Sequence, residues 1–274
     1  LGVNSSTGII PNTILNDAAI GSRLEGTSLY LEGSIDELRV WRRALCQEEI
    51  FAHMGCEALS NQTDLLAYYD FNQGAAAVSN SGETTLTDRT VNGNNGTLTN
   101  FTLSGTSSNW VAGSDSVSGE CSSALVVCGG YPTEPGSGYA LNFDGTDDFV
   151  AIPHSPVPVA ATSLTIEAWI KPEVGGINQN VILKGNYGWG MTLFSGNQLG
   201  YWSNSNALNC PSFSTVPIGK WTHVAIVVNE NVQTDFYING VLVGSSTNPL
   251  HTTINNGSNQ DLIIGKQGTG CNCN

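Results

Sequence analysis

The chain has 274 residues, of which only 12% are charged and 32 are glycine, and its formal net charge is -14. Such an acidic surface repels phosphate, which argues against a nucleic-acid partner. The low content of charged residues and the many small, turn-forming residues also argue against a helical cytosolic enzyme. The excess of carboxylates favours divalent cations, although solubility alone explains the charge equally well.

One helix is predicted in the first quarter of the chain, near residues 47–54. Glu48 and Glu49 fall in its first turn, where carboxylates favour the partial positive charge of a helix N-terminus. Gly55 follows the helix, as glycine commonly does at a helix C-terminus. We expect this short helix to pack one face against the edge of a sheet.

The other predicted elements are β-strands. Residues 164–170 alternate apolar and other side chains, as a half-buried strand does, and residues 221–228 are mostly apolar or β-branched. Residues 234–238 lead into Asn239-Gly240, the strongest hairpin signal in the chain, because both residues tolerate positive φ. Further strands are predicted at residues 241–244 and 261–265. Short strands punctuated by turn residues indicate an all-β sandwich.

The chain also contains a partial internal repeat. Residues 2–7 resemble residues 242–247, and residues 19–21 resemble residues 263–265. The first residues are therefore interpreted as the same structural segment as the last ones, so the chain enters late in one domain and stops late in the next.

Several motifs resemble laminin-G-like jelly rolls of the concanavalin-A-like superfamily, in the family's order over nearly the whole chain. They are residues 33–45 with Glu48-Glu49-Ile50, 66–72, Asp88 with 92–98, 140–150, 164–170, 221–228 and the Asn239-Gly240 hairpin. The resemblance implies an antiparallel jelly-roll β-sandwich. It says little about function, because this fold serves many ligands. The style also resembles repeats of very large surface adhesins of gliding and related Bacteroidota.

According to the resemblance, the ends of this chain do not coincide with the ends of a family domain. Residues 1–56 correspond to the C-terminal part of one repeat, 57–63 to a connector, and 64–274 to a repeat without its closing strand, in which 112–138 form a Gly/Ser/Pro-rich insertion. Neither piece is a complete sandwich, and unpaired strand edges are not stable. Either residues 1–56 fill the gap within the chain, as in a circular permutation, or neighbouring copies complete one another. The internal repeat favours the second arrangement, a window from a tandem array.

The seven cysteines favour disulfides over zinc. An odd number in an exported protein leaves one thiol over, and the one close pair is separated by a single residue, whereas zinc ligands usually have two to four residues between them. The proposed pairs are Cys46 with Cys56, Cys121 with Cys128, and Cys210 with Cys271 or Cys273, and their connectivity stays open. Residues 112–138 are interpreted as stapled by the second pair.

Calcium is the cofactor that the resemblance implies. Related jelly rolls often bind one structural ion near the rim of the sandwich, and the resemblance assigns Asp36 and Asp144 to that site. Calcium takes six to eight oxygen ligands. The alternative is that both carboxylates only accept hydrogen bonds from turn amides. Asp88 with Asn92 and Asn94 forms a second oxygen-rich loop and a weaker metal candidate.

Aromatic side chains near Gly-rich loops are candidates for ligand binding. Tyr187, Trp189 and Trp202 could stack on the apolar faces of sugars, with Tyr201 beside them. The alternative for Trp189 and Trp202 is core packing, and at least one of Tyr201 and Trp202 is expected in the core. Three other tryptophans are assigned to the core: Trp41, Trp169 and Trp221.

No pattern predicts catalysis. Glycosidases need two carboxylates that flank a bond, whereas Glu167 and Glu173 stand alone and Asp147-Asp148 lies in a turn. The four histidines show no triad or metal spacing, and His223 fits a strand as a satisfied structural residue. A Gly-x-Ser-x-Gly nucleophile elbow is also absent from the sequence.

The sequence therefore predicts a non-catalytic, extracellular structural and adhesive repeat of a surface fibre, in contact with neighbouring copies, whose weak contacts gain strength through repetition. The alternative is a discrete calcium-dependent carbohydrate-binding module attached to a secreted enzyme, with surface glycans as ligands. Membrane insertion is not expected, because no apolar stretch approaches the roughly 18 residues needed to span a bilayer. Residues 1–8 do not resemble a signal peptide, so any export signal lies outside this sequence.

Overall fold

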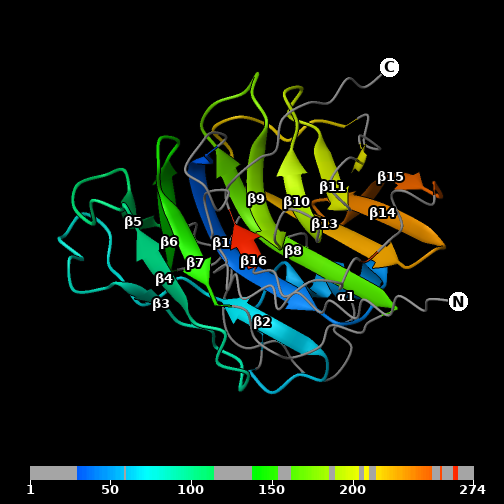
Figure 1. Cartoon of the computed structure of the whole chain (residues 1–274), viewed down its shortest axis with the longest axis horizontal. Helices are drawn as coiled ribbons and strands as arrows, with labels where there is room; N and C mark the ends of the chain where they lie inside the picture. Colours follow the sequence, from blue (N-terminus) through cyan, green and yellow to red (C-terminus); the bar gives the residue numbers. More distant parts are fainter. Residues whose placement is uncertain are drawn as a thin grey trace, which may run out of the picture.

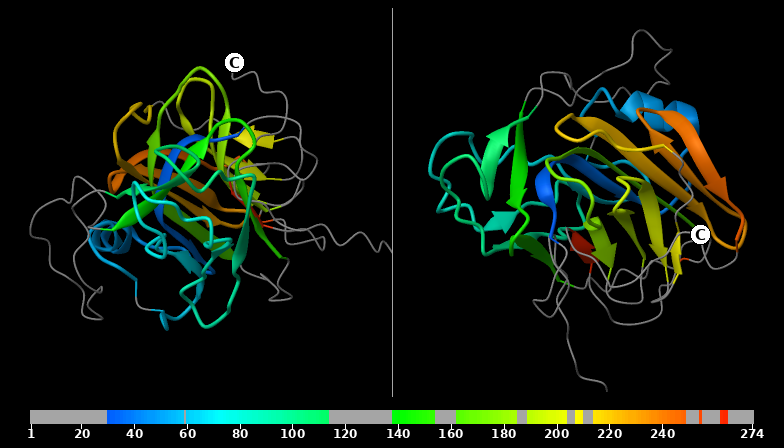
Figure 2. Two further views of the ribbon diagram at one scale, coloured as in Figure 1. Left: turned by 90° about the vertical axis from the view of Figure 1, so that its left-hand side faces the viewer. Right: turned by 90° about the horizontal axis from the view of Figure 1, so that it is seen from above.

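The computed structural model describes residues 30–58, 60–113, 138–153, 162–184, 189–203, 207–209, 214–248, 254 and 262–264. Within these residues the chain forms sixteen strands and one helix (Figure 1). The strands build two sheets, which Figure 2 shows as packed layers in its right-hand view. The all-β sandwich predicted from the sequence is confirmed.

The first sheet contains the longest strands and is antiparallel. Its order is β15 (Val241–Ser246), β14 (Gln233–Ile238), β13 (Thr222–Asn229), β8 (Ser163–Pro172), β1 (Glu32–Trp41), β6 (Tyr139–Asp144) and β5 (Asn109–Ala112), and β2 (Leu65–Tyr69) also pairs with β1. The turn between β14 and β15 has positive φ at both Asn239 and Gly240 (49° and 71°). The predicted hairpin is therefore confirmed.

The second sheet packs against the first and is also antiparallel. Its order is β12 (Ala207–Asn209), β11 (Leu199–Ser203), β10 (Trp189–Leu193), β9 (Gln179–Lys184), β16 (Leu262–Ile264), β7 (Phe149–Ile152), β4 (Gly96–Thr99) and β3 (Thr85–Leu86). β16 is the strand that was predicted at residues 261–265, and it lies between β9 and β7.

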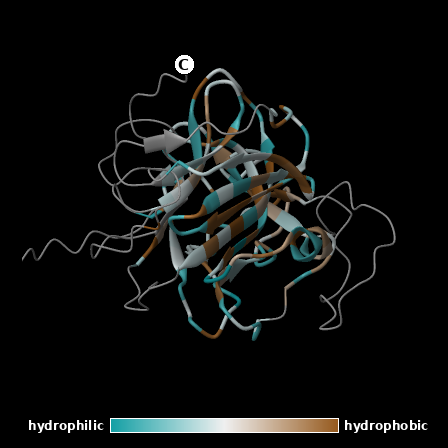
Figure 3. Cartoon of the chain, turned by 90° about the vertical axis from the view of Figure 1, so that its right-hand side faces the viewer, coloured by the Kyte–Doolittle hydropathy of each residue, from teal (hydrophilic) through white to brown (hydrophobic). Residues whose placement is uncertain are grey.

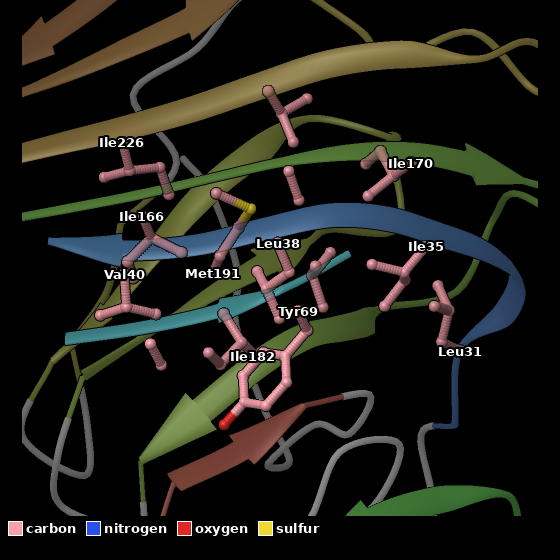
Figure 4. Close-up of a cluster of buried hydrophobic side chains, with 14 of the residues drawn as sticks. Leu31, Ile35, Leu38, Val40, Tyr69, Ile166, Ile170, Ile182, Met191 and Ile226 are labelled. Atoms are coloured by element: carbon pink, nitrogen blue, oxygen red, sulfur yellow. The ribbon is translucent and has the colours of Figure 1, made fainter. Parts of the chain in front are cut away.

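The main core lies between the sheets, where every second residue of a strand points inward. Leu38 of β1, Ile166 and Ile170 of β8, Ile182 of β9 and Met191 of β10 are all fully buried there (Figure 4). The resulting alternation of apolar and polar residues is visible along the strands in Figure 3. This period-two pattern is the reason that the strand predictions succeeded.

Strand β1 supplies the closing strand of the sandwich from within the same chain. It lies between β8 and β6, with Ile35 opposite both Ile170 and Leu141, and farther along it pairs with β2 through Leu38 and Tyr69. The expectation that neighbouring copies supply this strand is therefore corrected, because residues 32–41 fill the gap as a circular permutation would.

The proposed division into parts of two repeats stays a prediction, because the repeat at residues 2–21 lies outside the described residues. Most of the proposed 112–138 insertion lies outside them as well. The two described ends of that insertion meet, since Gly113 N donates a hydrogen bond to Gly138 O at 2.9 Å.

The predicted helix is confirmed as α1 (Gln47–His53), with Glu49 accepting a hydrogen bond from Cys46 N at its N-terminus. It covers the outer face of the first sheet instead of its edge, as the right-hand view of Figure 2 shows. Ile50 packs there in a second apolar cluster with Trp41 of β1 and Ala225 of β13. Trp169 is buried as well, whereas Trp221, predicted for the core, is only partly buried. No helix in the described part of the chain is long and apolar enough to cross a membrane.

Candidate functional site

The turn between β6 and β7, residues 144–148, gathers three carboxylates at one rim of the sandwich. Ligand oxygens of Asp144, Asp147 and Asp148 all lie within 4.8 Å of one another. None of the ion pairs between described residues includes any of the three. Among the described residues, no cationic side chain therefore lies within 4.0 Å of these carboxylates to offset their mutual repulsion. We call this group the acidic turn.

Tight local hydrogen bonds explain why this sequence folds into such a turn. Asp144 Oδ1 accepts hydrogen bonds from Thr146 N at 2.8 Å and from Asp147 N at 3.4 Å. Gly145 adopts a φ of 75°, a left-handed conformation that glycine reaches without strain. Asp148 closes the turn, because its Oδ2 accepts a hydrogen bond from Asp144 N at 3.0 Å.

Asp148 is the anchor of the acidic turn and is fully buried. Its Oδ1 accepts a hydrogen bond from Ser108 Oγ at 2.8 Å, which ties the turn to the residues before β5. Burial is the main cause that raises the pKa of Asp148 to about 7. The hydrogen bonds from Ser108 and Asp144 N oppose the rise, and the charges of Asp144 and Asp147 add to it. Without a cation, the turn therefore holds a proton more readily than an ordinary aspartate.

The donor set of the acidic turn fits a calcium ion. All the candidate ligands are carboxylate oxygens, which suit a hard cation such as Ca²⁺ better than zinc or copper. Asp144 Oδ2 and both carboxylate oxygens of Asp147 accept no hydrogen bond from the described residues. Glu32 lies directly opposite Asp144 in the β1–β6 ladder and adds a fourth acidic residue nearby. The residues present can therefore hold calcium at this rim.

Asp36 does not join Asp144, contrary to the expectation from the resemblance. Asp144 pairs with Glu32, whereas Asp36 lies four residues farther along β1, opposite Trp169. At about 3.3 Å per residue, this separates the two aspartates by roughly 13 Å. Asp36 Oδ1 accepts a hydrogen bond from Glu37 N at 2.9 Å, and burial and then the Glu37 charge raise the pKa of Asp36 well above its usual range.

The second predicted metal loop is organised by hydrogen bonds. Asp88 accepts four of them, from Tyr68 N, from Thr90 N and Oγ1, and from Asn94 N, at 2.8 to 3.1 Å. The amide groups of Asn92 and Asn94 donate to carbonyl oxygens of β2. The contacts favour the structural role of an Asx-rich turn for these three side chains.

The aromatic residues proposed as a sugar platform are buried. Trp189 is 2% exposed and Trp202 is 6% exposed, so neither offers a ring face to solvent. Tyr201 is fully buried, as predicted for at least one residue of that pair. Tyr187 lies outside the described residues. The expectation failed because a tryptophan beside a Gly-rich loop can still sit on a covered sheet face.

The proposed Cys46–Cys56 disulfide is wrong. Cys46 has a free and exposed thiol just before α1, whereas Cys56 is disulfide-bonded. The other five cysteines lie outside the described residues, so their pairing stays a prediction: Cys121, Cys128, Cys210, Cys271 and Cys273.

A buried charged cluster beneath α1 was missed by the sequence analysis. Glu167 Oε1 accepts hydrogen bonds from Trp41 Nε1 at 2.9 Å and pairs with His53 Nδ1 at 3.2 Å. Arg39 is also buried and donates to the carbonyl oxygens of His53 and Cys56, at the end of the helix. His223 is less well satisfied than predicted, because its Nδ1 has no hydrogen-bond partner. The cluster is buried, and its contacts with His53 and with the carbonyl oxygens at the end of α1 hold the helix on the sheet.

Comparisons with known proteins agree with this architecture. A family model described as the Concanavalin A-like lectin/glucanases superfamily matches residues 144–273, a range that begins at the acidic turn. No curated protein sequence matches the chain.

Two solved structures are similar to it. One is the structure of HCR/D-Sa-GBL1/C, which is 22% identical in sequence and has a TM-score of 0.34. The match covers 45% of this chain and 33% of that chain. The other is a "putative carbohydrate binding protein" from Bacteroides ovatus, with 10% identity, 85% and 65% covered, and a TM-score of 0.30. The chain thus spans about a third of the first structure and 65% of the second. The second half of this all-β chain is similar in sequence to the concanavalin A-like lectin/glucanase superfamily.

Proposed function

We propose that this chain is a calcium-binding, non-catalytic domain of an extracellular protein and that it recognises carbohydrate. The observation that carries the proposal is the acidic turn, in which Asp144, Asp147 and Asp148 converge without a neutralising side chain among the described residues. A divalent cation would relieve their repulsion and hold the β6–β7 turn in place. The acidic turn also starts the region that matches a family described by its lectins and glucanases.

A binding role is favoured over catalysis by the placement of the carboxylates. Glycoside hydrolysis needs two carboxyl groups about 5 to 10 Å apart at an accessible bond. Glu167 is fully buried beneath α1 and makes its contacts with Trp41 and His53. A substrate could therefore not reach this carboxylate without displacement of the helix.

An adhesive fibre repeat is the second candidate, and one feature of the first sheet favours it. Its edge strand β15 exposes two apolar side chains, Val241 at 53% and Leu242 at 45%. An exposed apolar edge strand is a template for pairing with another chain. Sedimentation velocity over a hundredfold range of concentration tests this candidate, and Leu242→Lys should abolish any association.

A glycan array probed in calcium and again in EDTA tests the main proposal. Wild-type protein should bind one set of glycans in calcium, and Asp147→Asn should lose that binding, because it removes a candidate ligand charge from the acidic turn. Glu83→Gln is the matched control, since this carboxylate lies on the loop between β2 and β3. Calcium-dependent binding that survives Asp147→Asn would remove the acidic turn from the account.

A further inference from the structure

A polar cavity lies on the molecule away from the acidic turn. Its volume is about 220 Å³. Its lining comes from the residue after β1, from the segment before and at the start of β2, and from the loop between β3 and β4. The lining residues are Arg42; Ser60, Asn61, Gln62, Asp64, Leu65 and Leu66; and Val91 and Asn92. Three separate segments of the chain therefore converge on it.

An arginine–aspartate pair forms one wall of the cavity. Asp64 Oδ1 accepts hydrogen bonds from both Arg42 Nε at 3.2 Å and Arg42 Nη2 at 2.9 Å. Arg42 Nη1 and Asp64 Oδ2 make no hydrogen bond to the described residues, and both side chains are partly exposed, at 41% and 30%. The wall therefore offers one donor and one acceptor side by side, with little net charge.

The other polar groups of the cavity also have unused hydrogen-bonding capacity. The side chains of Asn61 and Gln62 line it and form no hydrogen bond to the described residues. Asn92 uses its Nδ2 to donate to the carbonyl oxygens of Leu65 and Leu66, at 3.1 and 3.0 Å, which leaves its Oδ1 as an acceptor. Amides and hydrogen-bonding pairs of this kind suit a ligand with several hydroxyl groups.

The apolar part of the lining includes Val91, which lies in a loop organised by hydrogen bonds. Val91 is one of the lining residues and is 86% exposed to solvent, so its aliphatic side chain can lose contact with water when a ligand binds. Asp88 fixes this loop by accepting hydrogen bonds from Thr90 N and Asn94 N on either side of Val91. A preformed site loses less entropy when a ligand binds.

We propose that this cavity binds one ring of a neutral saccharide. Vicinal hydroxyl groups would bridge Arg42 Nη1 and Asp64 Oδ2, the amides would contact further hydroxyls, and Val91 would pack against the apolar face of the ring. The inference rests on the proposed function and names a subsite for it. Because the two charges of the cavity already neutralise each other, an acidic sugar would gain no net attraction there.

Nuclear magnetic resonance of the isotope-labelled full chain tests this site. Methyl glycosides of glucose, galactose, mannose and N-acetylglucosamine serve as neutral probes, and glucuronate serves as the acidic probe. At least one neutral glycoside should give saturable shifts of the Asn61, Gln62 and Asn92 side-chain amides. Arg42→Lys keeps the charge but loses the fork geometry, so it should weaken binding by about tenfold, the loss expected for a hydrogen bond to a charged group.

Matched variants separate a binding role from a change in folding. Val91→Ser should also weaken binding, and its exposure makes a folding defect unexpected. Val78→Ser and Arg89→Lys are the controls, since Val78 is 51% exposed and Arg89 pairs with Asp70 at 3.0 Å outside the cavity. Both should bind as tightly as wild type.

The outcomes distinguish the cavity from the proposed function. If glycans bind on the array but the resonance shifts occur outside the cavity, the cavity proposal fails and the proposed function stands. The same conclusion follows if Arg42→Lys and Val91→Ser bind with full affinity. If only glucuronate shifts the resonances of the cavity amides, the ligand is not a neutral saccharide. If neither the array nor the titrations detect any saccharide, the proposed function and the cavity site both fail.

Discussion

The carboxylate of Glu167 accepts a hydrogen bond from Trp41 Nε1 at 2.9 Å across the β8–β1 ladder. The two residues join the strand that closes the sandwich to its neighbour and lie directly beneath α1. His53 extends the same contact to the helix, since its ring stacks on Trp41 with the centroids 5.0 Å apart. The polar cluster therefore fastens the early part of the chain onto a sheet made largely from the later part.

Loss of the Glu167 charge should destabilise the fold strongly. Although burial raises the pKa of Glu167, the nearby His53, Arg39 and His223 lower it to about 2, so the carboxylate is ionised in the folded chain. Glu167→Gln removes the charge that faces His53 and, at 3.8 Å, Arg39, whereas Arg39 keeps its ion pair with Glu37. The free energy of unfolding should therefore fall by about 1.5 to 3 kcal/mol, the contribution of a hydrogen bond to a charged group. Urea denaturation measures this, and a loss below about 1 kcal/mol would show that the cluster contributes little. The exposed Glu173→Gln is the control.

The Asn239-Gly240 turn should tolerate no side chain at its second position. Gly240 has a φ of 71°, and a Cβ there would lie 2.8 Å from Phe51 Cδ2 and 3.2 Å from Met54 Sδ beneath the helix. Gly240→Ala should therefore cost more than Gly93→Ala, which has a similar φ of 66° but open space around it. We expect about 1 kcal/mol for Gly93→Ala, from backbone strain alone, and about 2 to 3 kcal/mol for Gly240→Ala. Equal losses in thermal unfolding would contradict the docking of α1 on this turn.

The strand positions could be predicted because period-two alternation is a local property of the sequence. Residues 164–170 and 234–238 therefore lie within β8 and β14. The pairing of strands, in contrast, is decided by contacts between residues far apart in the sequence, which a local pattern does not reveal. For this reason the internal repeat favoured completion by a neighbouring copy, whereas β1 completes the sandwich of its own chain.

The candidate site was predicted only in part, for a similar reason. Asp144 belongs to the acidic turn, but Asp147 and Asp148 become its partners only through the tight turn at Gly145. The register of β1 then places Asp36 too far away to take part. Alternation shows that Trp202 lies on one face of its strand, but it does not show whether that face is covered.

Stability without calcium should fall as the pH rises from about 4 to about 7. The folded state raises the pKa of Asp148 to about 7, chiefly by burial, and likewise that of Glu37 to about 7. These two carboxyls hold more protons in the folded state than in the unfolded chain, whereas His223, whose pKa burial lowers to about 4, holds fewer and offsets only one of them. The free energy of unfolding therefore decreases with pH across this window. Asp148→Asn should flatten the dependence in chelator-treated protein. A stability that increases steadily from pH 4 to 7 in both proteins would contradict the assignment.

Calcium should reverse part of that loss. An ion that binds only the folded state at a hundred times its Kd adds about 2.7 kcal/mol, which corresponds to a rise in Tm of about 5 to 10 °C for a domain of this size. The rise should be larger at pH 8 than at pH 6, because ligand carboxylates must lose their protons. Differential scanning calorimetry measures this, with Asp147→Asn expected to show no rise. An equal rise in Asp147→Asn would place the ion elsewhere.

The most direct measurement is an anomalous difference map from crystals grown in calcium chloride. The account predicts one peak at the acidic turn, with oxygens of Asp144 and Asp147 at the calcium distances of about 2.3 to 2.6 Å. A well-ordered turn with no anomalous peak, or a peak only at another part of the molecule, would contradict the proposal that this rim binds calcium.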